Sequence, residues 1–176
     1  MSQRCVTLVG PMGSGKTAVG KALAEILGYD FVDTDALICK RTGKSIPTLF
    51  EEFGETGFRA LESETIGTLA GSLSLVIATG GGAVIDPQNR QRFRDLGYTV
   101  YLKASPRELY QRIKNDTNRP LIAKAEDPRK EIEHLLQGRE HFYREADIVV
   151  ETEDLSVPEV ADFLLDELAK RTVGDG

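Results

Sequence analysis

The chain has 176 residues, of which 40% are hydrophobic, and its formal net charge is −6. This length and composition suit a single domain over residues 1–176 with a sizeable buried core. Because lysines and arginines are scattered through an acidic chain, we expect no basic face for nucleic acid or an anionic membrane. The sequence has no apolar run of about 20 residues and no signal-peptide pattern after Met1, which predicts a cytoplasmic protein.

Short apolar runs alternate with longer amphipathic segments along the chain. The runs predict strands at residues 5–9, 30–32, 75–78, 99–102 and 148–150. Strands that alternate with helices are typical of a parallel sheet covered on both faces, so we predict a three-layer α/β/α fold around a five-stranded parallel sheet. Cys5 and Cys39 have no Cys or His neighbour at metal-ligand spacing and are expected to be reduced structural thiols.

The first predicted strand runs directly into a glycine-rich turn. Residues 10–17 read GPMGSGKT and precede a helix predicted at 18–27, which matches the phosphate-binding pattern G-x-x-x-x-G-K-[ST] in its required position. Glycines let backbone N–H groups approach phosphate oxygens, Lys16 would reach the β- and γ-phosphates, and Thr17 would coordinate Mg²⁺. A dinucleotide-binding loop would need a glycine at position 18. We therefore predict an ATP site that includes Gly13, Ser14, Gly15, Lys16, Thr17 and Ala18.

A second acidic segment follows the second predicted strand. Residues 31–35 read FVDTD, which places Asp33 and Asp35 at the carboxyl edge of the sheet, where open α/β folds bind ligands. By strand alternation the two carboxylates would point the same way, one toward a metal and one toward a substrate hydroxyl. The local sequence equally allows Asp35 to be a helix N-cap or turn residue.

Later helices carry recognisable starts. Asp86, Ser105 and Asp127 each precede a proline, so an N-cap side chain comes before a proline at the first helical position. Residues 105–108 also fit a capping box. A last helix is predicted at 158–170, and its packing face would contain Val160, Phe163, Leu164 and Leu168.

Residues 115–127 read NDTNRPLIAKAED and lie between two predicted helices, where a short turn would suffice. Loops of about a dozen residues in compact domains often act as lids. An irregular surface loop without function is the other interpretation that the residues allow.

Further motifs follow the first two in a fixed order. Residues 58–62 read FRALE, residues 80–82 are a triple glycine, residues 119–121 read RPL, and Arg139 with Tyr143 forms R-x-x-x-Y. Together with the phosphate-binding loop and F-x-D-x-D, this order and spacing resembles the shikimate kinase family over nearly the whole chain.

The resemblance implies an ATP-dependent kinase that uses Mg²⁺ and acts as a monomer. It would transfer the γ-phosphate of ATP to the 3-hydroxyl of shikimate, giving shikimate 3-phosphate and ADP, on the pathway to chorismate and the aromatic amino acids. Residues 36–70 would form a shikimate-binding helical region and residues 115–127 the lid. The residues that the resemblance assigns to shikimate are Asp35, Arg59, Gly80, Gly81, Gly82 and Arg139.

The resemblance also assigns the remaining roles. Lys16, Asp35 and Arg119 would be catalytic, and Thr17 and Asp33 would hold the metal. Arg112, Arg119 and Pro158 would join the P-loop in nucleotide binding. Glu62 would orient Arg59, and Phe50 and Phe58 would either form an apolar wall under the substrate ring or simply pack in the core.

Alternatives remain open on the residues alone. Arg59 would more often form a surface ion pair with Glu62, and Arg139 would more often lie on a solvated helix face. A gluconate kinase or a nucleoside monophosphate kinase would share the P-loop and the lid, although the set of motifs argues against both. A regulatory ATP-binding module without transfer activity is a third possibility, which the presence of Lys16, Thr17, Asp33, Asp35 and Arg119 disfavours.

Overall fold

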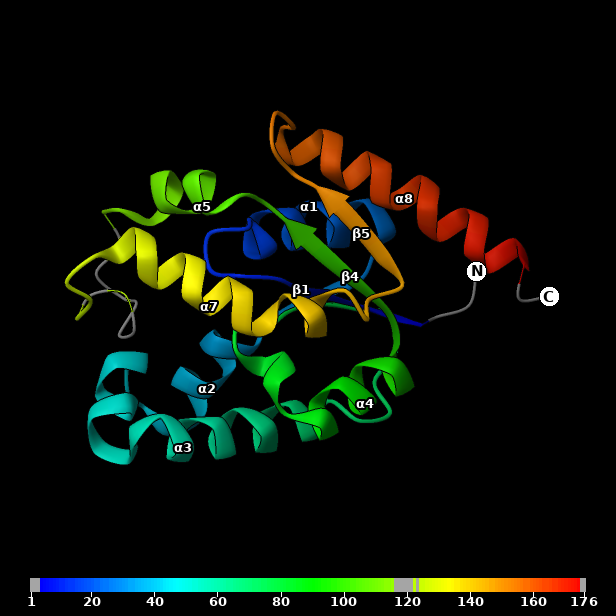
Figure 1. Cartoon of the computed structure of the whole chain (residues 1–176). Coiled ribbons are helices and arrows are strands. Elements are labelled where there is room, and N and C mark those ends of the chain that lie inside the picture. Colours follow the sequence, from blue (N-terminus) through cyan, green and yellow to red (C-terminus); the bar gives the residue numbers. More distant parts are fainter. Residues whose placement is uncertain (1–3, 116–121, 123, 175–176) are drawn as a thin grey trace.

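The computed structural model describes residues 4–115, 122 and 124–174 (Figure 1). Within these residues the sheet has five strands, all parallel, in the order β2-β3-β1-β4-β5. The strands are β1 (Cys5–Val9), β2 (Asp30–Asp33), β3 (Leu75–Ala78), β4 (Gly97–Lys103) and β5 (Ile148–Glu151). All the predicted strands are confirmed, although β4 begins at Gly97 rather than at residue 99.

Helices connect the strands and cover both faces of the sheet. They are α1 (Lys16–Leu27), α2 (Thr34–Thr42), α3 (Ile46–Gly67), the short 3₁₀ helix η1 (Ala83–Ile85), α4 (Pro87–Leu96), α5 (Pro106–Ile113), α7 (Pro128–Tyr143) and α8 (Val157–Gly174). No helix in the described part of the chain is long and apolar enough to cross a membrane.

Alternation along the strands produces the three layers. Val6 and Leu8 of β1 pack with one cluster that includes Leu23 of α1 and Leu164 of α8. Val9, from the opposite face of β1, packs with α3, α4 and α7. Figure 1 shows α1 and α8 on one side of the sheet and α3 and α4 on the other. The predicted α/β/α fold is therefore confirmed.

The predicted helix starts are confirmed, with one difference. Asp86, Ser105 and Asp127 each accept hydrogen bonds from backbone N–H groups in the first turn of the following helix. The reciprocal bond of the predicted capping box is absent, because the Ser105 N–H donates to Glu153 at 2.7 Å instead of to Glu108. Glu153 is 48 residues away in sequence, so a local pattern could not reveal it.

The predicted packing face of the last helix is partly wrong. Val160, Leu164 and Leu168 are buried, whereas Phe163 is 43% exposed. Position 163 lies about 100° around the helix from position 164. It therefore points away from the line formed by the other three residues.

Candidate active site

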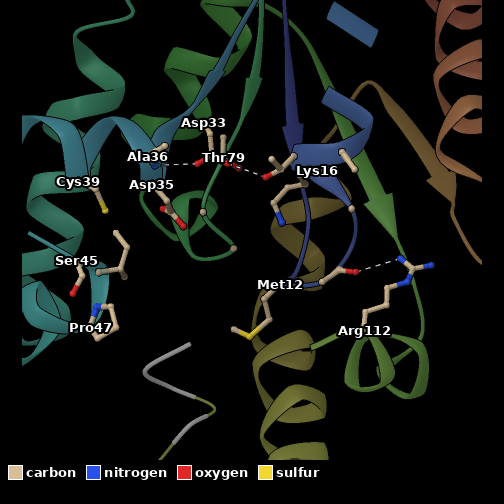
Figure 2. A pocket seen from close by; sticks show the side chains of 17 residues that line it. Met12, Lys16, Asp33, Asp35, Ala36, Cys39, Ser45, Pro47, Thr79 and Arg112 are labelled. Atoms are coloured by element: carbon tan, nitrogen blue, oxygen red, sulfur yellow. Dashed lines mark hydrogen bonds between the residues drawn. The ribbon is translucent and has the colours of Figure 1, made fainter. Parts of the chain in front are cut away.

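A cavity of about 700 Å³ opens at the carboxyl ends of β1, β2 and β3 (Figure 2). Open α/β sheets bind ligands at this edge, and the volume suits a small molecule. Figure 2 shows Met12 and Lys16 on the P-loop side of the cavity, facing Asp35 and Cys39 on α2. The phosphate-binding motif and the second acidic segment therefore face one shared space.

The P-loop (residues 10–17) packs closely against its neighbours. Gly13 has a φ of +80°, and a Cβ atom at this position would lie 2.6 Å from Ile113 of α5, so only glycine fits. Gly15, with a φ of +92°, is the N-cap of α1. The positive end of this helix lies at the cavity wall, where it favours an anion such as a phosphate.

Lys16 is held over its own loop. Its Nζ atom donates to the carbonyl oxygens of Gly10 at 2.7 Å and Pro11 at 2.8 Å, and lies 3.4 Å from the Ser14 hydroxyl. The side chain is 9% exposed. Ser14 is buried beside Lys16, whereas the other residues that the P-loop motif assigned to ATP line the cavity: Gly13, Gly15, Lys16, Thr17 and Ala18.

Asp33 connects the P-loop helix to α2. It accepts a hydrogen bond from the Thr17 hydroxyl at 2.8 Å and another from the Ala36 N–H at 3.1 Å. Asp33 is thus the N-cap of α2, and the alternative that Asp35 is the cap is wrong. The argument from strand alternation is also wrong, because β2 ends at Asp33 and Asp35 lies in the first turn of α2. Both carboxylates nevertheless line the cavity.

The contact between Thr17 and Asp33 supplies the kind of ligands that Mg²⁺ prefers. Magnesium takes oxygen ligands and commonly keeps several waters while one or two protein groups and substrate phosphates hold it. The described residues contain no cluster of three or more Asp, Glu, His or Cys side chains that could enclose a metal. The hydroxyl and the carboxylate beside the P-loop therefore fit a cation that is shared with a nucleotide.

The triple glycine leaves room for side chains from two helices. A Cβ atom at Gly80 would lie 2.6 Å from Glu62 and 2.9 Å from Asp35. A Cβ atom at Gly82 would lie 2.1 Å from Nη2 of Arg59. Such distances would force the side chains to move. At Gly80 and Gly82, therefore, protein side chains occupy the space beside the backbone.

Arg59 and Glu62 form a partly buried ion pair on α3. Nη1 of Arg59 lies 2.8 Å from Oε2 of Glu62, and Nη2 lies 3.5 Å from Glu55. Glu62 is fully buried, so the alternative of a surface pair is wrong. Burial raises the pKa of the Glu62 carboxyl, and the Arg59 charge opposes the rise. The pair holds the Arg59 guanidinium against Gly82.

Arg139 approaches the turn formed by Gly80, Gly81 and Gly82, the glycine turn, from α7. It is only 6% exposed, so the alternative of a solvated helix face is wrong. Its Nη1 atom would lie 3.8 Å from a Cβ atom at Gly81. Arg59 at Gly82 and Arg139 at Gly81 thus place two guanidinium groups at one turn, and such groups match a carboxylate in bidentate geometry.

The apolar residues around the acceptor side have mixed roles. The rings of Phe50 and Phe58 lie 4.4 Å apart and pack with Ile38 and Leu49. Neither ring is among the residues that line the cavity. Cys39 does line the cavity; burial, and then the charge of Asp35, raise the pKa of its thiol. Both cysteines are free, as the sequence predicted.

The nucleotide side extends beyond the P-loop toward α5. Arg112 lines the cavity, donates to the Gly13 carbonyl at 3.2 Å and pairs with Glu108 at 3.0 Å. A second cavity of about 720 Å³ shares Arg112 with the first. Pro158 is exposed in the first turn of α8 and lines neither cavity. Arg119, with residues 116–121 and 123 of the predicted lid, lies outside the described residues.

Several residues of the site were not predicted. Met12, Thr79 and residues 45–47 also line the cavity, and the Thr34 hydroxyl accepts from the Gly80 N–H at 3.3 Å. Ser45 is the N-cap of α3, and Pro47 follows in its first turn, so the signature that revealed other helix starts could have found it. The contact of Thr34 spans 46 residues and has no local signal.

Comparisons with known proteins agree with this geometry. The family model described as shikimate kinase matches residues 12–169. A shikimate kinase from Dechloromonas aromatica is 48% identical over 94% of this chain and 90% of that protein. The structure of shikimate kinase from Acinetobacter baumannii in complex with shikimate is 40% identical over 96% of this chain and 94% of that chain, with a TM-score of 0.92.

A gluconokinase from Sinorhizobium meliloti shares the fold, with a TM-score of 0.62 over 96% of this chain and 93% of that chain, but only 19% of its residues are identical. This likeness concerns the fold alone. The family model and the relatives of higher identity favour a shikimate kinase over the gluconate kinase that the sequence left open. The chain belongs to the shikimate kinase family.

Proposed function

We propose that this protein transfers the γ-phosphate of ATP to the 3-hydroxyl of shikimate, giving shikimate 3-phosphate and ADP. The observation that carries the proposal is the shared cavity, because a P-loop lines one side of it and Asp35 with the glycine turn lines the other. Two arginines lie at that turn. The cavity can therefore hold a nucleotide phosphate and a hydroxylated carboxylate next to each other.

On the nucleotide side, the P-loop amides and the N-terminus of α1 bind the phosphates. Lys16 exchanges contacts with the carbonyl oxygens of Gly10 and Pro11 for contacts with phosphate oxygens. Its charge then stabilises the negative charge that the transferred group carries in the loose transition state of phosphoryl transfer. Arg112, in the last turn of α5, reaches the Gly13 carbonyl of the P-loop, where it can cover the base of the nucleotide.

Thr17 and Asp33 would hold Mg²⁺ through the hydroxyl and the carboxylate oxygens. When bound, the ion would neutralise phosphate charge and help to orient the γ-phosphate. The protein itself contributes the hydrogen bond from the Thr17 hydroxyl to the Asp33 carboxylate at 2.8 Å, which already holds the two oxygens next to each other.

On the acceptor side, Arg59 and Arg139 bind the carboxylate of shikimate and Asp35 orients the hydroxyl that attacks. Asp35 lies in the first turn of α2, and its carboxylate faces Gly80, across the cavity from Lys16 (Figure 2). A carboxylate there can hold the hydroxyl in line with the γ-phosphate and accept its proton. Most of the rate enhancement then comes from positioning and from electrostatic stabilisation.

Some parts of the proposal rest on the sequence and the family resemblance. They are a lid over residues 115–127 that brings Arg119 to the phosphates, a contact of Pro158 with the nucleotide, shikimate binding by the region 36–70, a cytoplasmic location and a monomeric state. Sedimentation at several protein concentrations tests the last of these directly.

Release of ADP from Mg-ATP tests the proposal, with shikimate, gluconate and AMP as parallel acceptors and Asp35→Asn as the matched variant. We expect turnover with shikimate alone and a loss of at least about a hundredfold in the variant, the usual scale for a general base. Turnover with another acceptor would contradict the acceptor site and leave the P-loop assignment standing. Binding of ATP without any turnover would indicate a regulatory module.

A further inference from the structure

Two buried tyrosines stack behind the glycine turn, and their hydroxyl groups differ. Tyr101 of β4 and Tyr143 of α7 have ring centroids 5.1 Å apart, and they are 0% and 1% exposed. The Tyr143 hydroxyl donates to the Gly81 carbonyl oxygen at 2.6 Å. The Tyr101 hydroxyl is buried and has no hydrogen-bond partner among the described residues. One ring therefore only packs, whereas the other also holds a backbone group of the turn.

The Gly81 peptide lies at the junction of the two halves of the site. Gly81 lines the cavity, and a Cβ atom there would lie 3.4 Å from the Met12 N atom and 3.6 Å from the Gly10 carbonyl oxygen of the P-loop. A Cβ atom there would also lie 3.8 Å from Nη1 of Arg139. The orientation of this peptide therefore affects the space that the Arg139 guanidinium occupies.

Tyr143 can bond both neighbours at once. Burial raises the pKa of the Tyr143 hydroxyl to about 12. The charge of Arg139 and a hydrogen bond from that side chain oppose this rise. At neutral pH the hydroxyl is therefore protonated. A protonated phenol donates one hydrogen bond and can accept another, so it can donate to Gly81 while it accepts from Arg139.

We propose that Tyr143 is a positioning residue for the acceptor: its hydroxyl fixes the Gly81 peptide and the Arg139 guanidinium relative to each other. It thereby sets the affinity for the carboxylate of shikimate and leaves nucleotide binding unchanged. This inference rests on the proposed function, because it assigns the residue through the acceptor of that reaction.

The role is separable from folding. Tyr143→Phe keeps the ring and its stacking on Tyr101, and the turn keeps other bonds, among them the one from the Gly80 N–H to Thr34 at 3.3 Å. Tyr101→Phe removes the neighbouring hydroxyl, which has no partner among the described residues, and is the matched control. The two variants differ only in which hydroxyl of the stacked pair is lost.

The test compares the wild type, Tyr143→Phe and Tyr101→Phe in steady-state assays with shikimate and with its methyl ester. For Tyr143→Phe we expect the KM for shikimate to rise about fivefold to tenfold, the factor that corresponds to one hydrogen bond of ordinary strength. The kcat and the KM for ATP should stay within about twofold, because binding of the acceptor alone is weakened. The preference for shikimate over the ester should shrink by a similar factor, since the ester lacks the charge that Arg139 binds.

Each other outcome contradicts the inference in a recognisable way. Equal KM values for Tyr143→Phe and Tyr101→Phe would show that the hydroxyl does not position the acceptor. An equal rise in the KM for ATP, or a protein that no longer folds, would show a general structural role. If the wild type turns over ATP without using shikimate, the proposed function itself fails and the inference fails with it.

Discussion

The two ends of the cavity are built in different ways. The phosphate end is one continuous stretch, residues 10–17, in which Lys16 bonds to carbonyl oxygens five and six residues away. The acceptor end collects side chains from α2, α3 and α7 around the turn after β3. A change at the phosphate end should therefore impair the reaction itself, whereas a change in the glycines or the arginines of the acceptor end should act on the affinity for one substrate.

The largest expected effect is at the phosphate end. Lys16→Met removes the charge that faces the transferred group, and we expect kcat to fall by about a hundredfold to a thousandfold, as when one transition-state donor is deleted. The control is Lys21→Met, an exposed lysine on the same helix, which should change kcat by less than about twofold. If the two variants are equally active, the phosphate end does not work as described.

A smaller effect, confined to shikimate, is expected at the glycine turn. Gly82→Ala places a methyl group where the Arg59 guanidinium lies, 2.1 Å from Nη2, and displaces that side chain. Loss of a charge-assisted hydrogen bond corresponds to about a tenfold to hundredfold rise in the KM for shikimate. The KM for ATP should not change.

Gly138→Ala on α7 is the matched control for that variant. A Cβ atom at Gly138 meets no atom within 4 Å, so kinetics should be unchanged. Stability should increase by about 0.5–1 kcal/mol, because alanine is favoured over glycine within a helix. A Gly82→Ala protein whose KM for shikimate matches this control would contradict the account of the turn.

The smallest effect concerns the pH dependence of stability. The pKa of Glu62 is raised in the folded protein, chiefly by burial, so the folded state binds this proton more tightly than the unfolded state. Its contribution to stability is complete below the unfolded pKa of about 4.3 and is lost as pH rises through the folded pKa.

Relative to Glu62→Gln, the wild type should therefore lose free energy of unfolding as pH rises above about 4.3. Urea titrations of both proteins at a series of pH values measure this difference. A difference that is flat with pH, or one that grows in favour of the wild type, would contradict the assigned shift.

The contrast between the two ends also explains what the sequence could predict. The strands, the P-loop and the N-caps at Asp86, Ser105 and Asp127 depend on neighbours in sequence, and the structure confirms them. Glu153 accepts a hydrogen bond from the Ser105 N–H, 48 residues away in sequence, and Tyr143 donates one to Gly81, 62 residues away. No local sequence pattern reveals such contacts.

One wrong expectation and two rejected alternatives at the acceptor end have the same origin. The expectation that Asp33 and Asp35 alternate along a strand failed because the helix begins one residue after the first of them. Arg59 and Arg139 were weighed as surface residues, since most arginines are exposed, yet one pairs with the buried Glu62 and the other is itself buried. Tertiary packing, rather than local preference, decides the exposure of these side chains.

The most direct test of the proposed phosphoryl transfer is to follow the reaction of Mg-ATP and shikimate by phosphorus NMR. We predict a single new phosphomonoester on the 3-hydroxyl of shikimate, formed in equal amount to ADP. Inorganic phosphate as the only new product, or a phosphoryl group on another hydroxyl, would contradict the proposed placement of ATP and shikimate at the two ends of the cavity.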